Sequence, residues 1–169
     1  MVRKKSMNNL HEQDPASLVS IIIVTMGDNP LLHECLSSAR QQVACDLELI
    51  LINNSPDALN IPEGNGVRII ENGCNLGFAR AVNRGVEAAG GSIILLLNPD
   101  ARLTSDVVTP MKDFMTSRSS AGIAGIQLVF PDGSLQNSID IIPNLITQFL
   151  NKSLLKILFP GMYPSKRSG

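Results

Sequence analysis

A carboxylate and an amide directly follow an apolar stretch of the chain. Residues 92–97 read Ser-Ile-Ile-Leu-Leu-Leu, and Asn98, Pro99 and Asp100 come next. If the stretch is a strand of an open parallel sheet, these residues lie at its carboxyl end, where such sheets bind ligands. A carboxylate there can hold Mg²⁺ or Mn²⁺ bridged to substrate phosphates. We therefore predict a metal site at Asp100, with Asn98 as a second ligand; the alternative is a plain turn.

A second polar group lies in residues 72–85, which are rich in glycine, asparagine and arginine. Glycine allows close backbone approach, and asparagine or arginine at a helix start can contact a base or a phosphate. The candidate nucleotide-binding residues are Asn75, Gly77, Arg80 and Asn83. Arg80 and Arg84 form either a phosphate clamp or a solvated helix face. The segment matches neither GxGxxG nor Walker A, so dinucleotide and P-loop functions have no support.

The elements that must position these residues alternate between strands and helices. Asn29 and Pro30 provide a helix start, and Gly90 with Gly91 provides a helix end. Such alternation requires crossover connections, which predicts an α/β domain with a mostly parallel, Rossmann-like sheet flanked by helices. Short β-branched runs and helical apolar spacing predict strands at 18–24, 47–52, 67–70 and 92–97, and helices at 30–42, at 78–89 and from Thr109.

The rest of the chain completes the predicted organisation. Residues 121–130 predict a fifth strand, and a Pro-Asp-Gly turn leads into a short antiparallel partner at 134–138. Apolar residues from 141 to 159 predict a helix that closes the sheet, with a membrane-surface helix as the alternative. We expect a flexible polar leader over 1–17, which lacks the apolar core of a signal peptide, one domain over 18–140 and an apolar helical tail over 141–169.

Composition favours a folded domain and disfavours several function classes. The 169 residues include 14 Lys plus Arg and 15 Asp plus Glu, and 44% are hydrophobic. A chain of this length buries about 70% of its unfolded surface, which allows a normal core. The near-zero net charge gives no field that attracts nucleic acid, so no nucleic-acid partner is expected. Cys35, Cys45 and Cys74 fit neither a disulfide framework nor a zinc site and suit a reducing compartment.

Three stretches of the chain resemble the inverting, GT-A-fold glycosyltransferases of family 2, in particular the rhamnosyltransferase-like branch of polysaccharide and cell-wall assembly. They are residues 19–25 (VSIIIVT) with Cys35-Leu36, residues 75–85 (NLGFARAVNRG) and residues 94–101 (ILLLNPDA). Residues 130–136 (FPDGSLQ) extend the resemblance to about Ile142, so that it covers most of the chain.

The resemblance implies a reaction and a site. Thr25 and Asn53, followed by Asn54, stand after the first two predicted strands, and the resemblance implies that this edge contacts a nucleoside. Asp100 corresponds to the metal-binding end of a DxD-like element. The implied reaction is a single displacement from a nucleotide-diphosphate sugar to a saccharide or lipid-linked acceptor. A divalent cation stabilises the leaving diphosphate and a carboxylate deprotonates the acceptor hydroxyl.

The chain departs from the family pattern at named positions. Met26-Gly27 replaces the usual Tyr-Asn, and Asn53 replaces an aspartate, so that only one side-chain oxygen can accept hydrogen bonds. The family's acceptor-side half, with its Gly-Phe-Asp-Glu stretch and Glu-Asp pair, has no counterpart after Ile142, so we expect a truncated acceptor region. No catalytic base is assigned, and His11 and His33 are not expected to bind metal. The carboxylates considered as a base, which stand in no comparable motif, are Asp106, Asp113, Asp132 and Asp140.

Three functions are consistent with the sequence. The first is a glycosyltransferase domain of cell-surface polysaccharide synthesis, cytoplasmic or peripheral at the inner face of the membrane, whose acceptor half another chain supplies if it is needed. The second is a truncated, inactive relative that only binds nucleotide. The third is a module that uses residues 141–159 to bind a membrane or a partner. Turnover separates the first from the second, and loss of nucleotide binding with retained partner binding supports the third.

Overall fold

The computed structural model describes residues 2–3, 18–42, 46–61 and 66–136. The chain divides into two compact units, Met1–Ile126 and Gln127–Gly169. Residues 4–17 of the predicted leader and the whole predicted tail, 141–169, lie outside the described residues.

The first unit is built on a five-stranded sheet with the order β1-β5-β2-β3-β4. Four of these strands run parallel, and β1 pairs antiparallel with β5. The four predicted strands are confirmed to within a residue at either end, whereas β1 lies in the segment where no strand was predicted. The strands are β1 (Val2–Arg3), β2 (Val19–Thr25), β3 (Leu47–Asn53), β4 (Val67–Glu71) and β5 (Ile93–Leu97).

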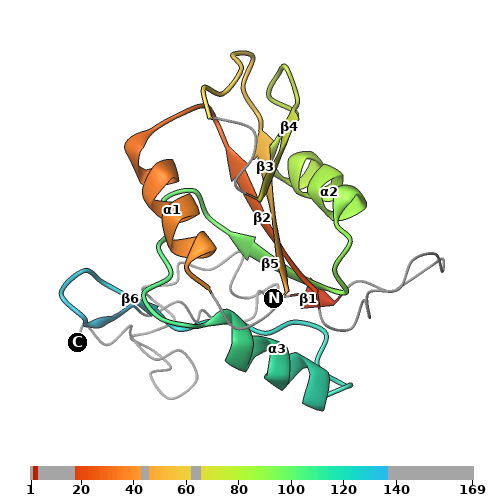
Figure 1. The fold of residues 1–169 in the computed structure, drawn as a ribbon, viewed down its shortest axis with the longest axis vertical. Helices are drawn as coiled ribbons and strands as arrows, with labels where there is room; N and C mark the ends of the chain where they lie inside the picture. The colour runs from red at the N-terminus through yellow and green to blue at the C-terminus, as the bar shows by residue number, and fades with distance from the viewer. Residues whose placement is uncertain (1, 4–17, 43–45, 62–65, 137–169) are drawn as a thin grey trace, which may run out of the picture. The chain divides into compact units, whose positions relative to one another are not determined.

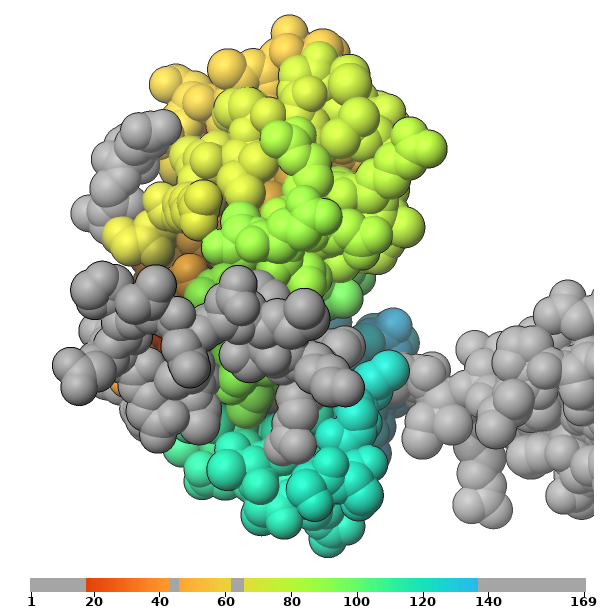
Figure 2. Space-filling model, turned by 90° about the vertical axis from the view of Figure 1, so that its right-hand side faces the viewer, coloured from red at the N-terminus to blue at the C-terminus, as the bar shows by residue number. Residues whose placement is uncertain are grey.

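Helices cover both faces of this sheet (Figure 1). α1 (Pro30–Arg40) and α3 (Val108–Ser117) pack on one face, and α2 (Phe78–Ala88) packs on the other. Figure 2 looks onto the α2 side of the unit. Successive side chains of a strand point to opposite faces, so the core has two layers. Both faces are buried, which explains the continuously apolar strands and confirms the predicted α/β architecture.

Local signals account for the starts of the helices. Asn29 Oδ1 accepts a hydrogen bond from the Leu32 N–H at 3.0 Å, and Pro30 occupies the first turn of α1, as predicted. α2 follows Gly77, whose φ of +80° favours glycine, and no side chain caps this helix. α3 begins one residue before the predicted position.

The second unit contains a small antiparallel pair, β6 (Leu128–Val129) and β7 (Leu135–Gln136). The predicted turn is confirmed: the Gly133 N–H donates to the Phe130 carbonyl oxygen at 2.9 Å. The predicted long strand over 121–130 is wrong, since only its last part forms β6. Gly122 and Gly125 interrupt this stretch, and a glycine offers no side chain to pack on a sheet.

A half-buried carboxylate joins the amino ends of three strands. Glu48 Oε1 accepts hydrogen bonds from Ser20 Oγ at 2.5 Å and from the N–H groups of Gly90 and Gly91 at 2.6 and 3.1 Å. The Gly91 N–H also donates to Ser20 Oγ at 2.9 Å. This network fixes the turn from α2 into β5, and therefore the start of the strand that leads to Asp100.

We predict that Gly91→Ala destabilises the protein and that Gly90→Ala, its matched control, does not. A Cβ at residue 91 would lie 2.6 Å from the Leu18 carbonyl oxygen and 2.7 Å from Ser20 Oγ, whereas a Cβ at residue 90 would meet nothing closer than 3.4 Å. Overpacking of this kind costs about 1 to 3 kcal/mol. Urea unfolding measures both variants, and equal free energies of unfolding would contradict the argument.

Candidate functional site

A cleft opens at the carboxyl ends of β2 and β5, at the point where the chain order of the sheet reverses. β2 lies between β3 and β5, so the connections leave it on opposite sides. In open α/β sheets this crevice is where ligands bind. The cleft has a volume of about 590 Å³, and both predicted metal ligands line it. Its lining residues are Val24, Asn29, Pro30, Leu31, Phe78, Asn98, Pro99 and Asp100.

The walls of the cleft are mainly apolar, and two helices begin there. Leu31 and Phe78 are large hydrophobic side chains that remain 52% and 62% exposed. Pro30 is the first residue of α1 and Phe78 the first of α2. The amino terminus of a helix carries a partial positive charge and unpaired N–H groups, which attract anions. The cleft therefore brings together two helix amino termini and the carboxylate of Asp100.

The Asp100 carboxylate is exposed and has no hydrogen-bond or ion-pair partner within the described part of the chain. Beneath it, Cys35 Sγ donates to the Asn98 carbonyl oxygen at 3.3 Å. Burial, and to a smaller extent the charge of Asp100, raises the pKa of Cys35 to about 11. The thiol is therefore protonated at neutral pH and can donate this bond.

The oxygen donors at this site suit a divalent cation that arrives with a phosphate ligand. No group of three or more His, Cys, Asp or Glu that could hold a metal occurs among the described residues. Mg²⁺ is commonly bound through one or two carboxylates plus substrate phosphates rather than by a cage of protein ligands. Asp100, with Asn98 beside it, fits that mode.

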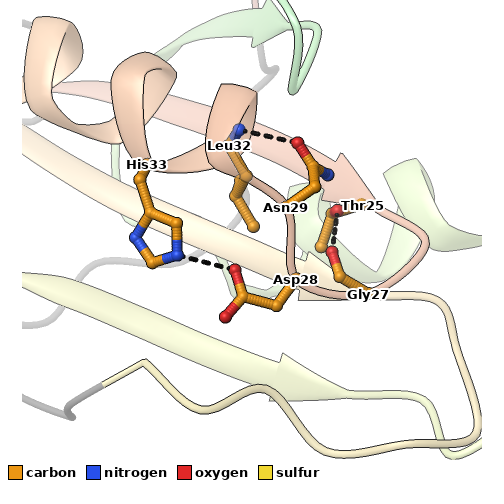
Figure 3. A network of polar contacts seen from close by, with 6 residues as sticks. All are labelled: Thr25, Gly27, Asp28, Asn29, Leu32 and His33. Carbon is orange, nitrogen blue, oxygen red and sulfur yellow. Dashed lines mark hydrogen bonds and ion pairs between the residues drawn. The ribbon is translucent and has the colours of Figure 1, made fainter.

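The turn between β2 and α1 takes the place of the family's Tyr-Asn (Figure 3). Thr25 Oγ1 donates to the Gly27 carbonyl oxygen at 2.6 Å, and Gly27 has a φ of +105°. His33 Nε2 lies 2.7 Å from the Asp28 carboxylate, so the histidine braces this turn. The Thr25 hydroxyl, predicted to contact a nucleoside, makes its hydrogen bond within the turn.

Asn53 is fully buried and all its hydrogen-bonding positions are used. Its Nδ2 donates to the Asp57 carbonyl oxygen at 2.6 Å and to Glu71 Oε2 at 2.5 Å, and its Oδ1 accepts from the Ser55 N–H and Oγ. An ionised aspartate could not donate to Glu71, which gives a physical reason for the amide here. Nucleoside contact by Asn53 stays a prediction, and it requires the exchange of one of these partners.

Asn54 ties three segments together at the same edge. Its N–H donates to the Thr25 carbonyl oxygen at 2.8 Å, and its Nδ2 donates to Asn75 Oδ1 at 3.0 Å. Asn54 Oδ1 accepts from Asn72 Nδ2 at 2.9 Å and from the Leu76 N–H at 3.0 Å. Both predicted residues, Asn54 and Asn75, therefore shape the loop that precedes α2.

The predicted residues in α2 and in the loop before it are of two kinds. Asn75 Oδ1 accepts from the Gly77 N–H at 2.8 Å, so Gly77 belongs to the loop framework. Arg80 and Asn83 are exposed and have no partner within the described ranges. Arg84 donates to Asn72 Oδ1, so it braces the loop. Of the two arginines, only Arg80 keeps a guanidinium available to an anion.

The other carboxylates considered as a base have structural surroundings. Asp106 precedes α3, and its Oδ1 accepts a hydrogen bond from the Thr109 N–H in the first turn of that helix at 3.2 Å. Asp132 accepts from Ser134 Oγ and N–H in the hairpin turn, and these bonds lower its pKa, which weakens it as a base. Asp113 is exposed on α3, and Asp140 lies outside the described residues.

The apolar walls and several buried polar contacts were not predictable from the sequence. Leu31 and Phe78 line the cleft, but each also fits an ordinary helical pattern. Glu71, bound to Asn53, follows a predicted strand directly and belongs to no motif. Asn29 had a visible signal, because an N-cap directly after a parallel strand must lie at the ligand-binding edge.

We predict that iodoacetamide modifies Cys74 well before Cys35 in the native protein at about pH 8, since only the thiolate reacts and the pKa of Cys35 is raised. Cys74 is exposed and Cys35 is buried. Peptide mapping after timed labelling measures both rates, and labelling in urea, where both thiols are accessible, is the control. Equal native rates would contradict the burial and donor role assigned to Cys35.

Comparisons with known proteins agree with this fold. The sequence profile of the family described as Glycosyl transferase family 2 matches residues 20–168. The N-acetylglucosaminyl-diphospho-decaprenol L-rhamnosyltransferase of Mycobacterium tuberculosis is 26% identical over 145 residues, which cover 76% of this chain and 47% of that protein. The PGL/p-HBAD biosynthesis glycosyltransferase of Mycobacterium bovis is 37% identical over 95 residues, 52% of this chain and 37% of the relative.

A third relative, the uncharacterized glycosyltransferase EpsJ of Bacillus subtilis, is 34% identical over 52% of this chain and 27% of its own length. The chain thus spans about half or less of the relatives it matches. The crystal structure of S. aureus TarS 1-349 superposes with a TM-score of 0.50 at 14% identity, covering 59% of this chain and 32% of that one, which bears on the fold alone. The GT-A architecture is confirmed, and the chain belongs to glycosyltransferase family 2.

Proposed function

We propose that this chain binds a nucleotide-diphosphate sugar, with the diphosphate in the cleft at the carboxyl ends of β2 and β5 and a Mg²⁺ or Mn²⁺ ion on Asp100. The observation that carries the proposal is the convergence on one cleft of two helix amino termini and a carboxylate that has no partner among the described residues. The helix termini attract phosphate, whereas the carboxylate repels it. A cation between them removes that conflict.

The groups that line the cleft, and Arg80 near the start of the helix beside it, then each have a role. Asp100 and Asn98 hold the cation, and the cation, when bound, offsets the charge of the departing nucleoside diphosphate. Arg80, in the first turn of α2, contacts a phosphate through its free guanidinium. Leu31 and Phe78 form apolar walls that are 52% and 62% exposed, so a bound donor covers them and the burial of this apolar surface adds to its binding.

The nucleoside lies along the neighbouring strand ends in this proposal. The predicted contacts are Thr25, Asn53, Asn54, Asn75, Gly77 and Asn83, all in or beside the hydrogen-bonded edge of β2, β3 and α2. Most of their polar groups are already paired within the protein, so this edge offers a shaped surface and a few exchangeable bonds.

The transfer reaction is proposed from the family and the relatives' names. We infer transfer of a rhamnosyl or another hexosyl residue to a saccharide or lipid-linked acceptor, with inversion, in cell-surface polysaccharide synthesis. One relative is named for a decaprenol-linked acceptor, which supports a lipid-linked class. In this proposal residues 18–140 bind the donor, and the acceptor site and base come from residues beyond the described part or from a complementing chain.

The proposed location is cytoplasmic, with peripheral contact at the inner face of the membrane, where a lipid-linked acceptor is reached. Among the helices that the structure describes, none has the length and apolar character needed to span a bilayer.

We predict that Mn²⁺ tightens the binding of one or more of dTDP, UDP and GDP, and that Asp100→Ala abolishes this effect. The reason is that Asp100 is the unpaired carboxylate in the cleft. Isothermal titration calorimetry with Mn²⁺ or with EDTA measures the effect, and the nucleotide that responds most identifies the base. Asp113→Ala, which removes an exposed carboxylate of α3, is the matched control.

Two results would contradict the proposal. One is a folded wild-type chain that binds none of the three nucleotides, and the other is a metal effect that survives in Asp100→Ala. Release of the nucleoside diphosphate from a matching sugar donor, with and without added acceptor, then distinguishes an active transferase from a relative that only binds nucleotide.

A further inference from the structure

One stripe of α1 carries polar side chains where a core helix would have apolar ones. Cys35, Ser38 and Gln42 follow one another at spacings of three and four residues, which places them on one side of the helix and just beyond its end. They are 0%, 4% and 6% exposed. Polar groups that are buried this deeply require hydrogen-bond partners.

All three side chains bond to the backbone of residues 98–108. Cys35 Sγ donates to the Asn98 carbonyl oxygen at 3.3 Å, and Ser38 Oγ accepts from the Leu103 N–H at 3.0 Å. Gln42 Nε2 donates to the Ser105 carbonyl oxygen at 2.8 Å, while its Oε1 accepts from the N–H groups of Val107 and Val108 at 2.9 and 3.3 Å. We call these three residues the α1 clamp.

The segment held by the α1 clamp has little regular structure. Residues 98–107 lie between the end of β5 and the start of α3 and belong to neither. Within it, the Ala101 N–H donates to the Asn98 carbonyl oxygen at 3.1 Å and closes one turn. The position of this segment on α1 therefore depends on side-chain bonds rather than on a helix or a strand ladder.

Asp100 lies within the part of the segment that the clamp holds on both sides. Asn98 is bound by Cys35, and Leu103 is bound by Ser38. The same helix begins at the cleft with Pro30, so bonds from α1 hold the backbone on either side of Asp100 at a set distance from that helix terminus. A phosphate and a cation that bind together need such a fixed spacing.

We propose that Cys35, Ser38 and Gln42 are positioning residues that hold the Asp100 carboxylate in the orientation required for joint binding of a divalent cation and a diphosphate. This role rests on the proposed function of the cleft. None of the three lines the cleft; each acts through the backbone of 98–108. Weakening the clamp should therefore reduce the effect of the metal on nucleotide binding more than it reduces nucleotide binding itself.

The test uses Ser38→Ala in the full chain, with Ser37→Ala as the matched control. The first variant leaves the Leu103 N–H without its acceptor, and the second removes an exposed hydroxyl of the same helix. Loss of residues that support a metal ligand commonly lowers metal affinity about 10- to 100-fold. We expect Mn²⁺ affinity in the presence of the nucleotide, measured by electron paramagnetic resonance, to fall within that range in Ser38→Ala alone. Calorimetry in EDTA should give wild-type nucleotide affinity for both variants.

A second pair keeps the test independent of whether Ser38→Ala folds. Cys35→Ala removes the donor to Asn98, and Cys35→Ser restores an O–H donor, so the serine variant should recover part of the lost Mn²⁺ affinity. Wild-type Mn²⁺ affinity in folded Ser38→Ala or Cys35→Ala overturns the positioning role. An equal loss of nucleotide affinity with and without metal also overturns it, because such a loss indicates general destabilisation. A wild-type chain that binds nucleotide with no Mn²⁺ effect refutes the metal site itself, a result distinct from both.

Discussion

Irregular backbone that is buried next to a parallel sheet must find hydrogen-bond partners, and this requirement shapes the whole carboxyl edge of the molecule. Buried polar side chains supply those partners where ladders end. Asn53 and Asn54 do so after β3, and Ser38 and Gln42 do so along α1. An unpaired buried N–H or carbonyl costs about 1 to 3 kcal/mol, so these few residues determine which loop conformations are tolerated.

The same requirement separates the frame of the site from its reactive surface. Residues whose polar groups are all used, such as Asn53, hold loops and have little left for a ligand. Residues with unused groups, Asp100 and Arg80, lie at the cleft and on the first turn of α2. A site of this kind is preorganised because its ligand-binding groups stand on backbone that other side chains have already fixed.

The sequence was sufficient to predict the four parallel strands, helices α1 to α3 and the place of Asp100 just after β5, because β-branched runs, caps and the strand-end position have direct physical meanings. It overestimated the stretch 121–130, where apolar residues suggested a strand but Gly122 and Gly125 weaken pairing. The α1 clamp could not be predicted, since a Cys such as Cys35 is also common as an ordinary core residue. A Ser or Gln on a helix is usually solvated. The function of the α1 clamp depends on partners more than sixty positions away.

The pairing of β1 with β5 affects whether the molecule associates with other copies of itself. Ile93 and Ile94 offer their outer backbone groups to Arg3 and Val2. Because β5 is wholly apolar, an exposed edge of β5 would pair readily with strands from other copies of the chain. Val2 and Arg3, near the amino terminus of the sequence, thus cover part of that edge. This pairing is short and joins distant parts of the chain, so it opens more easily than the longer pairings of β2 with β3 and β5.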